Sequence, residues 1–421
     1  MKRKGFWFSM MVVVVLAVAG LVACKKSGSQ DITLNLWHIG TQETRKAAID
    51  SAARRFEEAN PGVKIVVSIY ENDPYKTKLK TVSGDEFPDV LHSWGGGWLK
   101  SFVDSGLVYD ITELSKPWIG NVSAEYQKLS IFDNKVYGSP YNIGATPLYY
   151  NKALFEKFGL AFPQTWSELE KVCETFLANG IIPFALGNRS KWPGAQHFVL
   201  LSMRLGGPDI FQRALDGQTN FVDPVFIRAG EMLKGMVDKG WFPDGVNGIN
   251  YDTGGSRMMF YTEQCAMIVQ TTGFVASCKS ENIDFYTNKL AIGSYPAIEG
   301  TPGKNTDVLG GANSFSVANS SKNKEMATKL VEFLATDKQF QQDIVASGAL
   351  SALQGISTSD SLVNSLISFS EKATFMQNYI DQTLSPVMGE VHKDTVQALF
   401  GGTMTPLQAA EEMQRAFEAE Q

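Results

Sequence analysis

Cysteine and histidine are scarce in this chain of 421 residues, which contains four of each. So few cysteines exclude a small disulfide-stapled fold. No Cys-x-x-Cys pair or His-rich spacing typical of a zinc site is present, so we expect no metal and no other cofactor. The sequence also lacks a phosphate-binding loop, a dinucleotide-binding glycine motif, a Gly-x-Ser-x-Gly elbow and a His-Glu-x-x-His motif. These absences argue against the common classes of enzyme.

Positive charge is also limited, because 38 Lys and Arg stand against 44 Asp and Glu, which gives a net charge of −6. Three of the basic residues belong to a leader, so the processed chain carries 35 basic and 44 acidic residues, or −9. Such a surface repels nucleic acid and anionic lipid, and we expect a neutral or weakly polar ligand instead. The length and the 44% of hydrophobic residues fit two or three globular domains.

One long hydrophobic run stands at the N-terminus, where three basic residues precede the apolar residues 6–23 and Cys24. This order is typical of a secretory signal, although the run is about long enough to be a permanent membrane span. Residues 21–24 (Leu-Val-Ala-Cys) resemble a bacterial lipobox. We therefore expect a signal peptide over 1–23, a lipidated Cys24, a tether over 24–30, and an extracytoplasmic protein held on the bacterial cell envelope by its lipid only.

Three cysteines remain in the processed chain: Cys173, Cys265 and Cys278. An odd number permits at most one internal disulfide, and the pair that could form it is Cys265 and Cys278. Buried free thiols are the simpler interpretation.

Strand and helix patterns alternate in the first part of the chain. Residues 32–36 and 63–70 read as strands, residues 42–60 as an amphipathic helix, and residues 89–91 as a short strand before a glycine-rich loop over 93–97. This order predicts a parallel α/β unit.

A second α/β lobe is indicated after residue 140. Residues 148–151, 265–269, 290–293 and 314–318 read as strands, Thr165 opens a capped helix, and residues 308–313 read as a glycine-rich loop. Helices should dominate from there to the C-terminus. The absence of a Pro- or Ser-rich linker indicates short crossovers between the lobes.

Aromatic and small polar residues gather where these strands should end. Sugars lay their apolar faces on aromatic rings, while their hydroxyls need polar groups at fixed positions. In parallel α/β lobes such residues belong at the carboxyl ends of strands. On this basis the candidate ligand-binding residues are Trp37, His38, Asp73, Trp94, Asn142, Phe274, Gly311 and Asn313. Core packing is the alternative for each aromatic, and we favour it for Trp166 and Trp241.

Several short motifs carry a family resemblance. They include residues 56–62 (FEEANPG), 87–90 (FPDV), 148–152 (LYYNK) and 163–166 (PQTW), in that order. With them the chain resembles a bacterial extracellular solute-binding protein of the carbohydrate-uptake ABC transporters, the multiple-sugar and maltose type of family 1. The resemblance implies a periplasmic-binding-protein-like fold of type II, in which two α/β lobes are joined by a hinge and enclose a ligand cleft.

The resemblance also implies boundaries. The N-terminal lobe should comprise residues 31–142 plus 297–336, and the C-terminal lobe residues 143–296 plus 337–421. The hinge crossovers should lie near residues 142–147, 290–297 and 334–339.

By resemblance, ligand contacts come from the loop between His38 and Glu43, from the loop at Trp94, and from a second-lobe segment that contains Asn188, Arg189 and Trp192. Pro193 should hold Trp192 in an extended conformation and so direct its ring. The implied function is that of a lipid-anchored receptor, monomeric and without catalysis, that binds a mono- or oligosaccharide and passes it to the transmembrane subunits of an ABC permease. The alternatives are a secreted glycoside-processing enzyme and a binder of a charged solute in the same fold.

Overall fold

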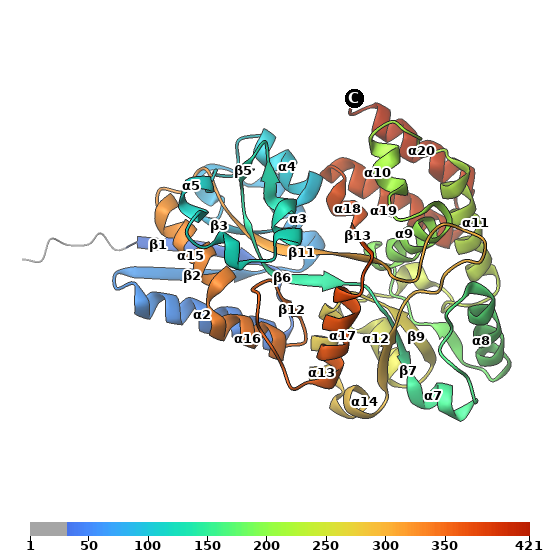
Figure 1. Cartoon of the computed structure of the whole chain (residues 1–421). Coiled ribbons are helices and arrows are strands. Elements are labelled where there is room, and N and C mark those ends of the chain that lie inside the picture. Colours follow the sequence, from blue (N-terminus) through green and yellow to red (C-terminus); the bar gives the residue numbers. More distant parts are fainter. Residues whose placement is uncertain (1–31) are drawn as a thin grey trace, which may run out of the picture.

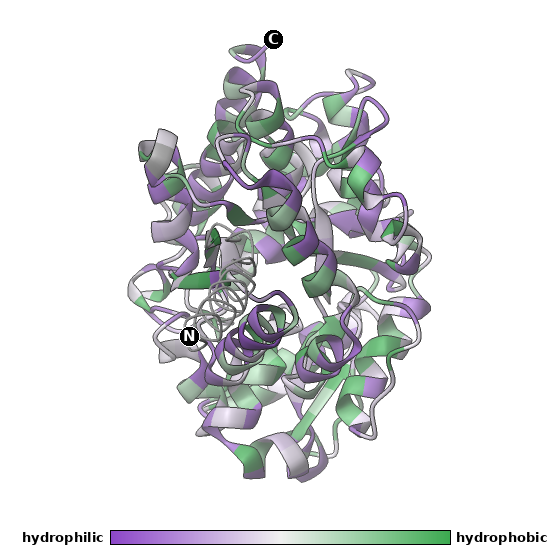
Figure 2. Ribbon diagram, turned by 90° about the vertical axis from the view of Figure 1, so that its left-hand side faces the viewer, coloured by the Kyte–Doolittle hydropathy of each residue, from purple (hydrophilic) through white to green (hydrophobic). Residues whose placement is uncertain are grey.

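The structure, a computed structural model, describes residues 32–421, so the predicted signal peptide, Cys24 and the tether lie outside the described residues. Two β-sheets with helices packed around them form two lobes that lie side by side (Figure 1). Along the covering helices, hydrophilic and hydrophobic residues alternate, as amphipathic helices require (Figure 2). Among residues 32–421 no helix is long and apolar enough to cross a membrane.

The first lobe is built on a mixed sheet with the strand order β12-β6-β11-β3-β1-β2, in which β12 is Leu350–Ser351. Strand β13 (Phe375–Asn378) lies beside β11. Strands β1 (Ile32–His38), β2 (Val63–Ile69) and β3 (Val90–Ser93) are parallel, which confirms the predicted parallel unit. Strand β11 (Asp307–Val317) runs antiparallel to β3 and to β6 (Ser139–Ala145). The helices that accompany this sheet are α2 (Glu43–Ala59), α3 (Asn72–Thr81), α4 (Gly96–Asp104), α5 (Thr112–Ser115), α6 (Ala124–Gln127), α15 (Lys324–Thr336) and α16 (Lys338–Ala346).

The second lobe is built on the sheet β10-β7-β9-β8, whose strands are β7 (Leu148–Asn151), β8 (Ile182–Phe184), β9 (Cys265–Val269) and β10 (Leu290–Gly293). Its helices are α7 (Lys152–Lys157), α8 (Trp166–Ala178), α9 (Trp192–Gly206), α10 (Ile210–Leu215), α11 (Pro224–Asp238), α12 (Gly255–Tyr261), α13 (Gly273–Glu281), α14 (Ile283–Asn288), α17 (Ser361–Glu371), α19 (Pro386–Gly401) and α20 (Pro406–Glu418). Thr165 and Glu168 form a capping box at the start of α8, as the predicted helix start requires.

The core of the second lobe accounts for several aromatic residues and cysteines. Trp241 is 1% exposed, and its ring lies 5.7 Å from that of Trp166, so both indoles pack within this lobe. Cys173, Cys265 and Cys278 are buried free thiols.

The glycine-rich segment 308–313 is a strand and not the predicted loop, since it forms the first half of β11. This half lies between β6 and β13 (Phe375–Asn378). A Cβ on Gly310 would lie 2.5 Å from the carbonyl oxygen of Gly144, and one on Gly311 would lie 2.7 Å from Oδ1 of Asn378. Glycine therefore permits close approach of neighbouring chain segments here.

The C-terminal third departs from the prediction in two ways. Helices dominate it as predicted, but the prediction missed two short strands, β12 (Leu350–Ser351) and β13, which both join the first sheet. Helix α16 packs on α2, and its Phe340 and Ile344 are fully buried in the first lobe's core, so residues 337–351 belong with the first lobe. Val345 and Leu350 of this segment also contact the core of the second lobe. The crossover expected near residues 334–339 lies instead between β12 and α17. The period of a helix shows which of its faces is apolar but not which lobe will cover that face.

The three glycines after Trp94, which end the loop and begin α4, serve backbone packing. Gly95 and Gly96 have φ of 73° and 63°, and a Cβ on Gly97 would lie 2.2 Å from the carbonyl oxygen of Thr383. Thr383 ends the short helix α18 (Ile380–Thr383), which packs on α4. The loop and the C-terminal segment thus touch backbone to backbone.

We expect Gly97→Ala to lower the free energy of unfolding by about 2 kcal/mol, because the added methyl group must displace α18. Urea-induced unfolding measures this loss. Gly235→Ala is the control, since Gly235 lies within α11 with open space where its Cβ would be, and alanine there should be neutral or stabilising by up to about 1 kcal/mol. Equal stability of the two variants would contradict the packing role.

Candidate ligand-binding site

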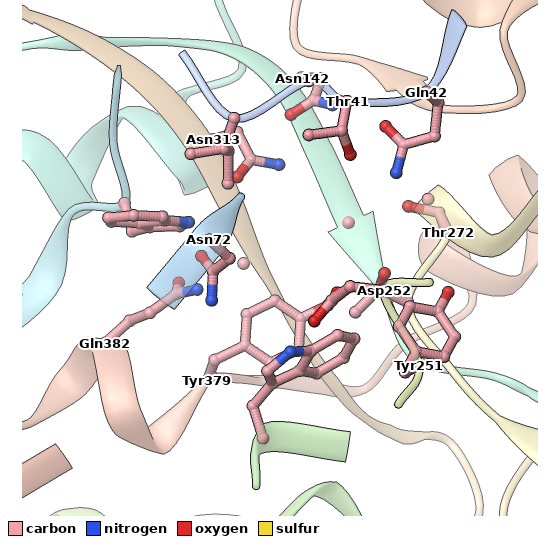
Figure 3. A pocket seen from close by; sticks show the side chains of 18 of the residues that line it. Thr41, Gln42, Asn72, Asn142, Tyr251, Asp252, Thr272, Asn313, Tyr379 and Gln382 are labelled. Atoms are coloured by element: carbon pink, nitrogen blue, oxygen red, sulfur yellow. The ribbon is translucent and has the colours of Figure 1, made fainter. Parts of the chain in front are cut away.

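A cavity of about 600 Å³ lies between the two lobes. The first lobe contributes the loop after β1, the start of α3 and the middle of β11, and the second lobe contributes α9 and the segments around residues 251 and 272. The C-terminal segment at α18 adds another wall. Figure 3 shows the labelled side chains from these walls facing a common space: Thr41, Gln42, Asn72, Asn142, Tyr251, Asp252, Thr272, Asn313, Tyr379 and Gln382.

Six residues that the sequence nominated line this cavity. They are Glu43, Trp94, Asn142, Trp192, Gly311 and Asn313. They come from both lobes, so the structure brings together positions that are far apart in the chain. Their contact with a ligand stays a prediction.

Three other nominated residues are core residues away from the cavity. Trp37 is 8% exposed and packs at 5.1 Å from the ring of Tyr70, while Phe274 is fully buried at 4.8 Å from Tyr149. His38 is fully buried, and its Nδ1 accepts a hydrogen bond from the Gly40 amide at 3.0 Å. Trp37 and His38 end β1, and Phe274 lies in the first turn of α13. Each of the three side chains turns into its lobe, where burial of a ring is favourable.

Asp73, Asn188 and Arg189 also lie outside the cavity lining. Asn188 is fully buried and structural: its Nδ2 donates to Oδ1 of Asn247 at 2.7 Å, and its Oδ1 accepts from the Gly194 amide at 3.1 Å. Arg189 is exposed to solvent. Asp73 lies 3.9 Å from Nζ of Lys393, across the boundary between α3 and α19.

Trp192 lines the cavity, but its backbone differs from the prediction. It is the first residue of α9, although a proline follows it, and was expected to be extended. Pro193 falls in the first helical turn, where a missing amide costs no intrahelical hydrogen bond. The Trp192 ring meets that of Tyr251 edge to face at 5.2 Å, and its Nε1 has no partner.

Trp94 lies at the cavity wall with little of its ring exposed. Its indole packs edge to face on Trp98 at 4.7 Å, and Nζ of Lys76 lies 4.8 Å from its ring centre. Lys76 also pairs with Asp381 at 3.0 Å. A cation therefore already contacts this ring, and Trp94 has a packing role in addition to its place at the cavity.

Sequence reasoning missed part of the lining. Tyr379 and Gln382 follow β13, a strand in a region read as helical, and Tyr251 lies in a loop without a strand pattern before it. Thr272 follows the predicted strand 265–269, but only the nearby Phe274 was nominated there. Asn378 and Tyr379 lie at the carboxyl end of β13, where ligand-binding residues are expected in α/β lobes. Recognition of this strand in the sequence would therefore have nominated Tyr379.

Polar atoms without partners surround the cavity. Among the described residues, the buried lining atoms with no hydrogen-bond partner are Nε and Nη2 of Arg45, Oδ1 of Asn142, Nε1 of Trp192, Oε1 of Gln196, Oε1 of Gln382 and Nε2 of His392. Buried polar groups in proteins are nearly always hydrogen-bonded. These unpaired donors and acceptors lie on several walls of the cavity, where they can form hydrogen bonds with a polar ligand.

Two ion pairs hold charged lining residues in place. Burial alone would raise the pKa of Asp381, but Lys76 and Lys393 hold that pKa below its ordinary value. Arg257 contacts Glu281 through Nη2 at 2.6 Å and Nε at 2.9 Å. Burial alone would lower the pKa of this guanidinium, and the hydrogen bonds to Glu281 raise it.

Residues 32–421 contain no group of three or more His, Cys, Asp or Glu side chains placed to hold a metal ion.

Comparisons with known proteins find several relatives of this chain. The multiple sugar-binding protein of Streptococcus mutans is 23% identical over 357 residues, which cover 82% of each chain. An uncharacterized ABC transporter extracellular-binding protein of Pyrococcus horikoshii is 26% identical over 260 residues, 56% of this chain and 58% of that protein.

A solved structure reported with biochemical and structural insights into xylan utilization by the thermophilic bacterium Caldanaerobius polysaccharolyticus has a TM-score of 0.85 and 30% identity. The superposition covers 91% of this chain and 99% of that chain, which confirms the two-lobed α/β fold. Residues 40–339 match the family described as bacterial extracellular solute-binding protein. Since this match spans more than half of the sequence, the chain belongs to the family of bacterial extracellular solute-binding proteins.

Proposed function

We propose that this protein is the substrate-binding component of a sugar ABC importer, which binds a mono- or oligosaccharide in the cavity between its lobes. The observation that carries the proposal is the lining itself: open polar atoms such as Oδ1 of Asn142 and Oε1 of Gln382 stand beside the rings of Trp192, Tyr251 and Tyr379. Sugars need this combination of apolar platform and fixed hydrogen-bond partners. A multiple sugar-binding protein and a protein of xylan utilization among the similar proteins support the same ligand class.

The carboxylates of the cavity favour binding over glycoside cleavage. A cleaving enzyme needs one carboxyl group that stays protonated at working pH and so can act as an acid. Asp381 instead has a lowered pKa because of its lysine neighbours, and Glu281 is bound to Arg257. Glu43, Glu71 and Asp252 are exposed to solvent. A binding role without chemistry is therefore the function that we propose.

Isothermal titration calorimetry against a panel of mono- and oligosaccharides tests the proposal, with chromatography of each mixture after overnight incubation. We expect at least one sugar to bind and to be recovered unchanged. Release of shorter sugars would select the enzyme, and binding of a polyamine or metal ion without any sugar would select a charged solute.

We further propose that the mature protein begins at a lipidated Cys24 and delivers its ligand to transmembrane permease subunits. The support is the signal-like residues 1–23 in front of the cysteine, together with a family of extracellular proteins. Cells fed a labelled fatty acid should yield labelled protein, and Cys24→Ala should abolish the label. A labelled Cys24→Ala protein would exclude this anchor.

A further inference from the structure

One cation in the cavity has no counter-charge. Arg45 lies in the first turn of α2 and is 7% exposed, and its Nε and Nη2 have no hydrogen-bond partner. The neighbouring side chain that interacts with it is that of Tyr141, a neutral phenol, and no carboxylate of the described residues pairs with it. The other buried cations of the lining, Lys76 and Arg257, each have a carboxylate within 3.0 Å.

The surroundings disfavour a cation at this position. The N-terminal end of a helix carries partial positive charge, so the start of α2 is unfavourable for an arginine. Burial is the main cause that lowers the pKa of the guanidinium, and Tyr141 opposes it only in part. A buried, unpaired guanidinium destabilises a fold unless something else compensates its charge.

Gly40 provides the space that the Arg45 side chain occupies at the cavity. A Cβ on Gly40 would lie 2.9 Å from Cγ of Arg45 and 3.2 Å from Nδ1 of His38, so the glycine leaves the room that the arginine stem occupies. Gly40 and Arg45 both line the cavity. The open donors thus belong to a built site and not to a surface side chain.

We infer that Arg45 receives the carboxylate of an acidic sugar, so that the ligand of this cavity carries a uronate group. The inference rests on the proposed sugar-binding function and names its ligand class. A guanidinium offers parallel N–H donors that match the two oxygens of a carboxylate, and such charged pairs are stronger than hydrogen bonds to hydroxyls. Glu43, Glu71 and Asp252 also line the cavity, but they are exposed, where solvent and salt screen their repulsion of an anion.

Calorimetry with matched pairs of sugars tests this inference. The probes are glucose with glucuronate, galactose with galacturonate, and neutral disaccharides with their uronate-bearing counterparts. We expect the acidic member of at least one pair to bind about tenfold or more tightly than its neutral partner. Arg45→Gln should bring that ratio close to one, and Arg45→Lys should retain part of it. Arg54→Gln is the matched control, because Arg54 is an exposed residue of the same helix, and the ratio should not change.

The outcomes separate the two proposals. Neutral sugars that bind as well as or better than acidic ones would overturn the role of Arg45 and leave sugar binding intact, whereas a panel without any binding sugar would overturn both. Thermal unfolding of the ligand-free variants supplies an independent readout. If Arg45 serves ligand binding and does not stabilise the ligand-free fold, the Arg45→Gln variant should melt no lower than the wild type. A marked drop in its melting temperature would show that Arg45 is a structural residue instead.

Discussion

Trp192→Ala should stay folded and lose most of its affinity for sugar, by about 2 kcal/mol or more, which is roughly thirtyfold. The indole starts α9 at the cavity wall, is only partly buried, and meets Tyr251 edge to face. Its removal therefore deletes an apolar platform and an open N–H donor at the cavity while leaving the two lobe cores intact. Calorimetry with a sugar selected from the panel measures the loss.

Two further variants make the result specific. Trp192→Phe keeps a ring without the N–H and should lose less affinity than the alanine variant. Arg189→Ala changes an exposed residue of the same segment outside the cavity lining, and its affinity should equal that of the wild type. A steep fall of the ligand-free melting temperature in Trp192→Ala, with affinity retained, would instead identify a core residue.

Acid should destabilise this protein well above the pH at which most carboxylates titrate. All four histidines are buried, and burial is the largest cause that lowers each pKa: to about 4 in His38 and His392, to about 3 in His197, and well below the ordinary value in His92. The unfolded chain takes up protons on these side chains near pH 6.5, whereas the folded chain does not. Stability is therefore complete above about pH 6.5 and falls as the pH drops toward 4, by about 2 kcal/mol per histidine at pH 5.

His197 offers the cleanest test, because aromatic rings surround it and neither of its ring nitrogens has a hydrogen-bond partner. The free energy of unfolding in urea should be measured at pH 7.5, 6.5 and 5 for the wild type and for His197→Leu. The variant should gain on the wild type as the pH falls, since it no longer has a group to protonate on unfolding. A difference that stays constant across this range would show that His197 contributes nothing to the acid sensitivity.

The sequence by itself determined the local elements and the family. The period of two in residues 32–36, the helix that ends before residues 60–62, and the capped helix after Thr165 all depend on neighbouring residues, and the structure has each of them. Short-range patterns of this kind are physical constraints on a segment wherever it lies in the fold. For the same reason the ordered motifs were sufficient to identify a family of two-lobed binding proteins.

Only the tertiary structure decided which side chains reach the cavity. Trp37 lies at the end of β1, Trp94 follows β3 and Phe274 follows β9, and all three pack in the cores of the lobes. Of the three, Trp94 alone also lines the cavity. An aromatic side chain at a strand end can serve core packing or ligand contact. Which of the two it serves depends on packing partners that are distant in sequence. Tyr379, Arg45 and the path of β11 between two neighbouring strands were undetermined for the same reason: contacts across the lobes place them, and no local pattern records those contacts.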